Sequence, residues 1–155
     1  MMLVSSCLAG LAVRYNGTDC LDETIAKLLE TKQAVTVCPE LLGGLAIPRE
    51  PAEIQGGDGY AVLDGRASVV TSSGEDVTEQ FVLGANLALR HAREVGATVV
   101  VLKANSPSCG SGMIYDGTFR GRRIAGHGVT AALLQRSGIR VISELELADY
   151  LSGIE

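Results

Sequence analysis

The chain has 155 residues, of which 46% are hydrophobic and 20% charged, and its formal net charge is −5. This length and composition predict one globular domain over residues 1–155 and exclude a disordered or fibrous protein. The acidic excess argues against stable nucleic-acid binding, because nucleic-acid-binding surfaces are typically basic. We find no leader or membrane-spanning pattern, so we expect a cytoplasmic protein with no membrane contact. The oligomeric state stays open.

The first third of the chain alternates short apolar runs with one amphipathic segment. Residues 2–5 predict a central strand, and residues 21–33 predict a helix, because their apolar residues follow an i, i+4, i+7, i+8 spacing. Residues 34–37 predict a second strand, after which Pro39 either stops strand pairing or begins a helical turn. Residues 43–59 are rich in glycine and predict a long, ordered loop.

Two Asp-Gly pairs, Asp64-Gly65 and Asp116-Gly117, indicate turns in the rest of the chain. The first predicts a hairpin between residues 60–63 and 66–70, and the second a hairpin over residues 114–119. Helices are predicted over residues 76–95, 129–135 and 144–151, and strands over residues 97–102 and 139–142. The alternation predicts an α/β fold with three layers, in which an open, mainly parallel sheet carries helices on both faces. This Rossmann-like fold would hold one or two inserted β-hairpins.

Three of the four cysteines follow predicted strands. They are Cys7, Cys38 and Cys109. Because the carboxyl ends of parallel strands meet at one edge of a sheet, we expect their side chains to converge there. The chain has no Cys-x-x-Cys motif, which excludes a zinc ribbon and a thioredoxin-type centre. Convergent thiols suggest a metal site with one open position, whereas burial of all four cysteines as packing residues is the alternative. Cys20 lies near a helix start, and we interpret it as a packing residue.

The motifs around these cysteines form an ordered set along the chain. They are Ser6-Cys7-Leu8 with Arg14-Tyr15-Asn16-Gly17, Cys38-Pro39-Glu40 with Gly44-Leu45 and Pro48-Arg49, Gly74-Glu75-Asp76-Val77-Thr78, Lys103 with Ser106-Pro107-Ser108-Cys109-Gly110, Tyr115-Asp116-Gly117, and Gly126-His127-Gly128-Val129. From residue 5 to about residue 142, this set resembles the thiouracil desulfurases, long catalogued as a domain of unknown function. Asn16 stands where the family pattern has an aspartate.

The resemblance implies a [4Fe-4S] cluster held by Cys7, Cys38 and Cys109, with the fourth iron open to the sulfur of a thiocarbonyl substrate. It implies an enzyme that removes sulfur from 2-thiouracil, or from a related thiolated base or nucleotide, without net redox change. The products would be uracil and sulfide. The expected partner is therefore a small thiolated pyrimidine.

Two residues of these motifs are candidates for catalysis. The family's acidic catalytic residue falls on Glu40, which would activate water or shuttle a proton, although a carboxylate in a first helical turn is the alternative. Its active-site serine falls on residues 106–108, where we favour Ser106. This hydroxyl would orient the substrate or donate to developing charge, and support of the turn around Pro107 is the alternative.

Five further residues are candidate substrate contacts, because polar contacts concentrate in the loops at strand ends. They are Ser108, Asn105, Arg49, Lys103 and His127. Lys103 would offset the negative charge of a cluster or meet an anionic group, and His127 would carry a proton or donate to a cluster sulfur. Gly126 and Gly128 would allow close backbone approach beside His127. Solvated charges and turn-supporting side chains are the structural alternatives.

Two other functions stay open at this point. A zinc hydrolase would bind its metal through the three cysteines and a water, and one equivalent of zinc without iron would identify it. A non-enzymatic iron–sulfur or small-ligand binding domain would bind without turnover, and release of its cluster to an acceptor would identify that function.

Overall fold

Four parallel strands form the central sheet of the computed structural model, which describes residues 1–9, 23–46 and 49–152. Their order in the sheet is β2-β1-β5-β8, so β1 lies between β2 and β5. The bounds are Met2–Ser5 for β1, Ala34–Val37 for β2, Val99–Leu102 for β5 and Arg140–Ser143 for β8. All four strands lie within or overlap the spans that the apolar runs predict.

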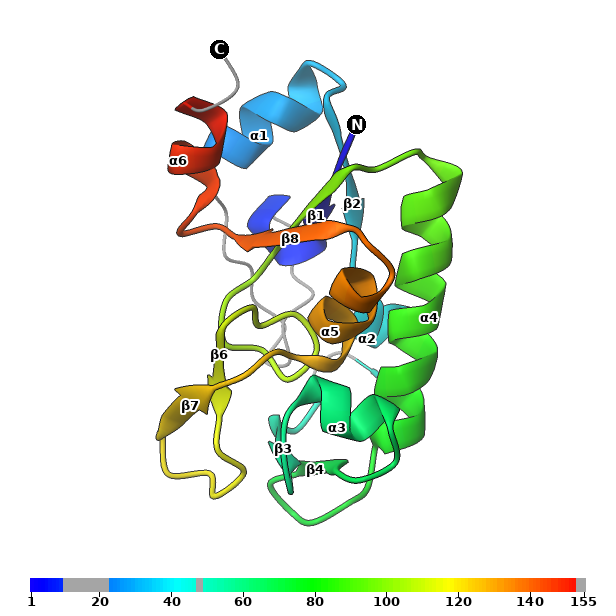
Figure 1. The fold of residues 1–155 in the computed structure, drawn as a ribbon, viewed down its shortest axis with the longest axis vertical. Helices are drawn as coiled ribbons and strands as arrows, with labels where there is room; N and C mark the ends of the chain where they lie inside the picture. The colour runs from blue at the N-terminus through cyan, green and yellow to red at the C-terminus, as the bar shows by residue number, and fades with distance from the viewer. Residues whose placement is uncertain (10–22, 47–48, 153–155) are drawn as a thin grey trace.

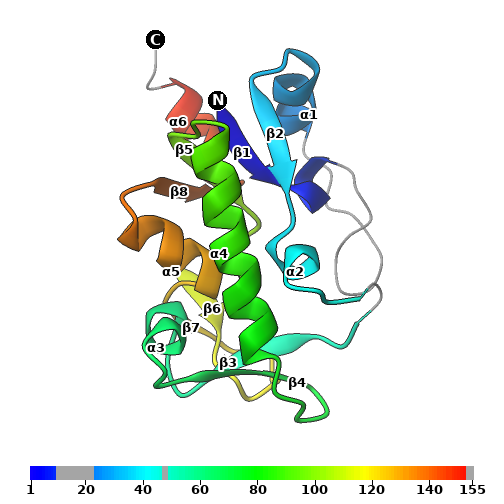
Figure 2. The same cartoon turned by 90° about the vertical axis from the view of Figure 1, so that its right-hand side faces the viewer.

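Helices cover both faces of this sheet, as Figures 1 and 2 show. Alternate strand residues point to opposite faces, so Leu3 and Val100 pack in one apolar cluster, whereas Val4 and Val101 pack in another. The first cluster includes side chains from α4 (Thr78–Glu94) and α5 (Val129–Arg136). The second includes side chains from α1 (Glu23–Glu30) and α6 (Leu147–Ser152). The predicted three-layer α/β fold is confirmed. Among the described helices, none has the length and apolarity that a bilayer crossing requires.

A second group of elements lies at the end of the molecule opposite the amino terminus (Figure 1). Strands β3 (Ala52–Gln55) and β4 (Ser68–Thr71) pair in antiparallel fashion, and α3 (Gly59–Leu63) lies between them in sequence. The hairpin of β6 (Met113–Tyr115) and β7 (Arg123–Ala125) lies beside them. A third apolar cluster, which includes Ile54, Val69 and Phe81, joins this group to α4.

The predicted hairpin between residues 60–63 and 66–70 is wrong, because residues 60–63 belong to helix α3. The Asp58 side chain accepts a hydrogen bond from the backbone N–H of Ala61, which caps the amino end of the helix. Gly65, at φ +76°, lies in the left-handed region just after the helix. The Asp-Gly pair therefore ends a short helix, and β4 pairs instead with β3, which lies inside the expected 43–59 loop.

The second Asp-Gly hairpin does form, but its return strand starts later than predicted. Asp116 and Gly117 open a loop over residues 116–122, and β7 begins at Arg123. The Asp116 backbone N–H donates to the Arg122 carbonyl and closes this loop. The tip is therefore long enough to fold back onto other elements, as described below.

A glycine contact fixes the short helix α2 (Pro39–Leu42) against α4. Pro39 is the first residue of α2, so the prediction that it begins a helical turn is confirmed. A Cβ atom at Gly84 would overlap the Pro39 carbonyl oxygen, and one at Gly43 would overlap the Gln80 carbonyl oxygen. Only glycine at both positions lets the two backbones meet this closely. The position of α2, and of Glu40 on it, therefore depends on the absence of a Cβ atom at Gly43 and Gly84.

We expect Gly84→Ala to lower the free energy of unfolding by about 2 kcal/mol. Overpacking costs about 1–3 kcal/mol, and better helix propensity offsets up to about 1 kcal/mol of that loss. Urea denaturation measures the change, and Leu83→Ala is the control, because the Leu83 side chain is half exposed one residue earlier. Equal stability of Gly84→Ala and the wild type would show that α2 can move away from α4 without cost.

Candidate active site

A cavity of about 870 Å³ lies where the parallel strands end, and the three strand-end cysteines are among the residues that line it. Cys7 lies in η1 (Ser6–Ala9), a 3-10 turn that directly follows β1. Cys38 follows β2 and precedes the first residue of α2, in an extended conformation at φ −127°. Cys109 lies in the loop after β5. Because β2, β1 and β5 are neighbours in the sheet, these connections open onto the same space.

Within the described residues, none of the three cysteines forms a disulfide, and the surroundings of Cys38 and Cys109 disfavour negative charge. Burial raises the pKa of the Cys109 thiol well above its usual value, and the nearby Glu40, Cys38 and Cys7 raise it further. Burial also raises the pKa of the Cys38 thiol. Thiolates become stable in such a place when a cationic metal centre binds them, because the metal supplies the missing positive charge. The donor set therefore fits a metal centre with thiolate ligands.

The spacing of the donors bears on the kind of metal centre. Within residues 1–9, 23–46 and 49–152, no three His, Cys, Asp or Glu side chains form a group compact enough for one metal ion. A single zinc ion binds thiolates at about 2.3 Å and gathers them tightly. An iron–sulfur cluster binds each thiolate through a different iron and so needs no such compact group. The lack of such a group among the described residues is therefore no argument against a cluster.

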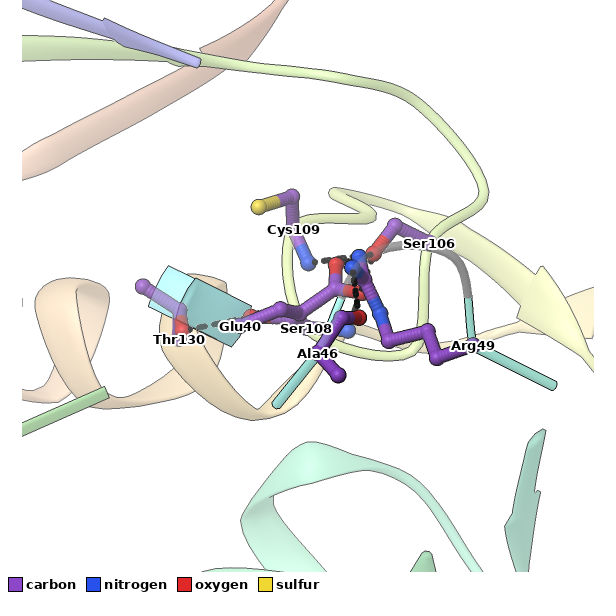
Figure 3. Close-up of polar contacts among 7 residues, drawn as sticks. All are labelled: Glu40, Ala46, Arg49, Ser106, Ser108, Cys109 and Thr130. Atoms are coloured by element: carbon purple, nitrogen blue, oxygen red, sulfur yellow. Dashed lines mark hydrogen bonds and ion pairs between the residues drawn. The ribbon is translucent and has the colours of Figure 1, made fainter. Parts of the chain in front are cut away.

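Glu40 is held between two side chains at the cavity wall (Figure 3). Arg49 Nη2 lies 2.5 Å from Glu40 Oε2, and both side chains are largely buried. The Ser106 hydroxyl donates to Glu40 Oε1 over 3.3 Å. Arg49 Nη1 also donates to the Ala46 carbonyl oxygen at 3.2 Å, which anchors the guanidinium. The Glu40 carboxylate is thus oriented through both of its oxygens.

Ser106 links this carboxylate to the loop that carries Cys109. Its Oγ accepts hydrogen bonds from the backbone N–H groups of Ser108 and Cys109, each at 3.1 Å. With these two donors on Oγ, the hydroxyl proton points elsewhere, and it is directed at Glu40. Ser106 therefore connects the candidate acid–base residue with a candidate metal ligand.

Three of the five candidate substrate contacts line the cavity. They are Arg49, Lys103 and Asn105. Lys103 Nζ lies 3.7 Å from Glu144 Oε2, so its charge is balanced within the protein. Asn105 adopts φ +69°, a left-handed conformation that asparagine tolerates better than most residues.

The other two candidates, Ser108 and His127, are not among the lining residues. Ser108 is buried, and its Oγ lies 2.8 Å from Thr130 Oγ1 at the start of α5. His127 Nδ1 accepts a hydrogen bond from the Gly112 N–H at 3.0 Å, and its ring meets Tyr60 edge to face. The close backbone approach expected beside His127 does occur, since a Cβ atom at Gly128 would lie 2.5 Å from the Ser108 carbonyl group. Both side chains hold the Cys109 loop against α5.

The structure also places residues at the cavity that the sequence argument missed. Ser5, the last residue of β1, accepts a hydrogen bond from the Lys103 N–H at 3.0 Å, and its side chain lowers the pKa of the Cys109 thiol against the larger effect of burial. A polar residue that ends an apolar strand is a signal that could have identified it. Glu53 and Phe119 line the cavity as well, but no local motif marks either of them. Cys20, Arg14 and Asn16 lie outside the described residues.

Comparisons with known proteins agree on one family. The sequence model of a family described as 2-thiouracil desulfurase matches residues 2–146. The chain is 60% identical over 151 residues to the uncharacterized protein YbbK of Bacillus subtilis (strain 168). The aligned region covers 97% of this chain and 100% of YbbK. It is also similar to the solved structure of TudS, a [4Fe-4S]-dependent thiouracil desulfidase. That likeness has a TM-score of 0.87 and 43% identity, and it covers 99% of this chain and 96% of the other.

Proposed function

Since the chain belongs to the 2-thiouracil desulfurase family, we propose that it is a [4Fe-4S]-dependent enzyme that replaces the sulfur of 2-thiouracil, or of a related thiolated base or nucleotide, with oxygen. The overall reaction consumes one water and gives uracil and sulfide. A carbon–oxygen bond forms at C2, the carbon–sulfur bond breaks, and no electrons are exchanged with an outside partner.

Cys7, Cys38 and Cys109 are the proposed cluster ligands. They follow three neighbouring strands and line one cavity, and their surroundings favour a cationic centre. With three protein ligands, a bound cluster supplies one open position on a thiophilic Lewis acid. The Ser5 hydroxyl, which lowers the pKa of the Cys109 thiol, would help to stabilise that ligand as a thiolate.

Glu40 is the proposed general base. Its carboxylate would take the proton from the water that attacks C2 and return it to the departing sulfur or to a ring nitrogen. Arg49 would hold Glu40 in place, because the two side chains form an ion pair at the cavity wall. Ser106 would turn its proton from Glu40 to the charge that develops on the substrate, while the two backbone donors hold its Oγ in place.

Lys103 and Asn105 are the proposed further substrate contacts, because they line the cavity beside Ser106. We assign Ser108 and His127 to the support of the Cys109 loop, given their contacts with Thr130 and Gly112. The observation that carries the proposal is that the three cysteines, Glu40 and Ser106 all line one cavity at the ends of the parallel strands.

Anaerobic reconstitution of the full chain with iron and sulfide tests the proposal. We expect about four irons and four acid-labile sulfides per chain, and release of sulfide from 2-thiouracil without any added reductant. Zinc at one equivalent with no iron would instead indicate the hydrolase alternative. A stable cluster with no turnover of thiolated bases would indicate a binding or carrier domain.

A further inference from the structure

The tip of the β6–β7 hairpin is fastened to strand β3 by a buried carboxylate. Glu53 Oε1 accepts hydrogen bonds from the backbone N–H groups of Gly117, at 2.9 Å, and Phe119, at 3.2 Å. The Gln55 side chain donates to the Gly117 carbonyl oxygen at 3.0 Å. A Cβ atom at Gly117 would lie 2.6 Å from the Ile54 carbonyl oxygen, so the tip lies directly on the β3 backbone. Residues more than sixty positions apart in sequence thus fix this loop.

Within the loop that Glu53 binds, Phe119 has a strained backbone conformation. Its φ is +57°, a left-handed conformation that is exceptional for a large side chain. Strain of this kind persists where the surroundings determine the conformation, and it gathers at ligand-binding sites. Here, Glu53 binds the Phe119 N–H, while Asp116 binds both the N–H and the hydroxyl of Thr118.

Phe119 is one of the residues that line the cavity of the cysteines. It is half-buried, whereas Phe81, the other phenylalanine among the lining residues, is fully buried in the core. Apolar side chains line the same cavity together with carboxylates such as Glu50, Glu53 and Glu75, and Phe119 adds an aromatic side chain to this mixed wall. A planar aromatic ring in this setting suits a planar heterocycle, because the two rings can stack.

We propose that Phe119 stacks on the pyrimidine ring of the substrate, and that Glu53 is the residue that positions it. The inference rests on the proposed function, and it adds a residue that selects aromatic thiolated rings over non-aromatic ones. Glu53 acts through the loop backbone, since its Oε1 holds the two N–H groups on either side of Thr118.

Two substrates with the same thiocarbonyl group test the stacking. They are 2-thiouracil, whose ring is planar and aromatic, and 5,6-dihydro-2-thiouracil, whose ring is not. We expect Phe119→Leu to raise KM for 2-thiouracil about tenfold, and KM for the dihydro compound by less than about twofold. Phe119→Gly should give the same KM pattern while raising the melting temperature, because glycine relieves the strain. Arg120→Ala, at the exposed neighbouring residue, is the control and should change neither KM.

The positioning role of Glu53 has its own readout. We expect Glu53→Ala to reproduce the KM pattern of Phe119→Leu, and Glu53→Gln to restore most of the affinity, because glutamine keeps one acceptor oxygen. Equal losses for both substrates, or wild-type KM values in Phe119→Leu and Phe119→Gly, would overturn the proposal. Calorimetry with uracil on the protein as isolated separates this inference from the proposed function. Weaker binding to Phe119→Leu would support stacking even if the wild type released no sulfide, and unchanged binding would count against it.

Discussion

Cys109→Ala protein, reconstituted anaerobically with iron and sulfide, is expected to lose its cluster and its activity together. Cys109 lines the same cavity as Cys7 and Cys38, and removal of one of the three proposed ligands would leave two irons without protein support. Even changes beyond the direct ligands of a metal cost 10–100-fold in affinity or activity, so we expect the rate of sulfide release to fall by more than about 100-fold. Iron analysis and the visible absorption of the cluster measure the first loss, and a sulfide assay measures the second.

Cys20→Ala is the matched control, because Cys20 is the one cysteine that does not follow a predicted strand. It should keep the wild-type iron content and rate. Circular dichroism shows whether Cys109→Ala still folds, which we expect, because the change removes only one buried sulfur. A folded Cys109→Ala protein with four irons and full activity would show that the cluster ligands lie elsewhere.

Glu40→Gln is expected to keep the cluster and lose turnover. Glutamine has nearly the same shape and keeps one oxygen that can accept from Arg49, so residue 40 should stay in place. Its NH2 group cannot accept from Ser106, and the side chain cannot take a proton from water. Loss of a general base lowers kcat by about 10²- to 10⁴-fold. Steady-state kinetics with 2-thiouracil on protein of matched iron content measures the effect, and KM should change little.

The control for Glu40→Gln is the same chemical change at a second carboxylate of the cavity. Glu50 also lines the cavity, and its carboxylate accepts a hydrogen bond from the Ser73 hydroxyl. Glu50→Gln should keep a kcat close to that of the wild type. If both variants lose activity equally, the charge of the cavity and not proton transfer at Glu40 is what matters.

The sequence predicted the sheet and its helices well, because buried parallel strands leave a strong local signal. Runs such as Ala34–Val37 and residues 97–102 contain little besides apolar side chains, and the spacing of residues 76–95 fits one helix face. From the strand ends alone, the three cysteines were expected to meet, and in the structure all three line one cavity. Their role as ligands stays a prediction.

Local apolar patterns could not predict the short elements or the contacts between residues far apart in sequence. Five residues of α3 cannot display a helical period, so an Asp-Gly pair that ends this helix was interpreted as a hairpin turn. The fastening of Gly117 by Glu53, and the contact of Gly43 with α4, join residues far apart in sequence. Such contacts depend on how the helices and strands pack against one another, and a local sequence pattern does not contain that information.

The sheet order has a consequence for how the enzyme would be assembled. A compact motif can wrap a cluster as soon as its few residues leave the ribosome, but the proposed ligands here are separated by 31 and 71 residues. They come together only after β1 has paired with β2 on one side and with β5 on the other. On the proposed assignment, the nascent chain has no cluster site of its own. Cofactor loading would therefore be a late event, in which a delivery system meets an already folded protein.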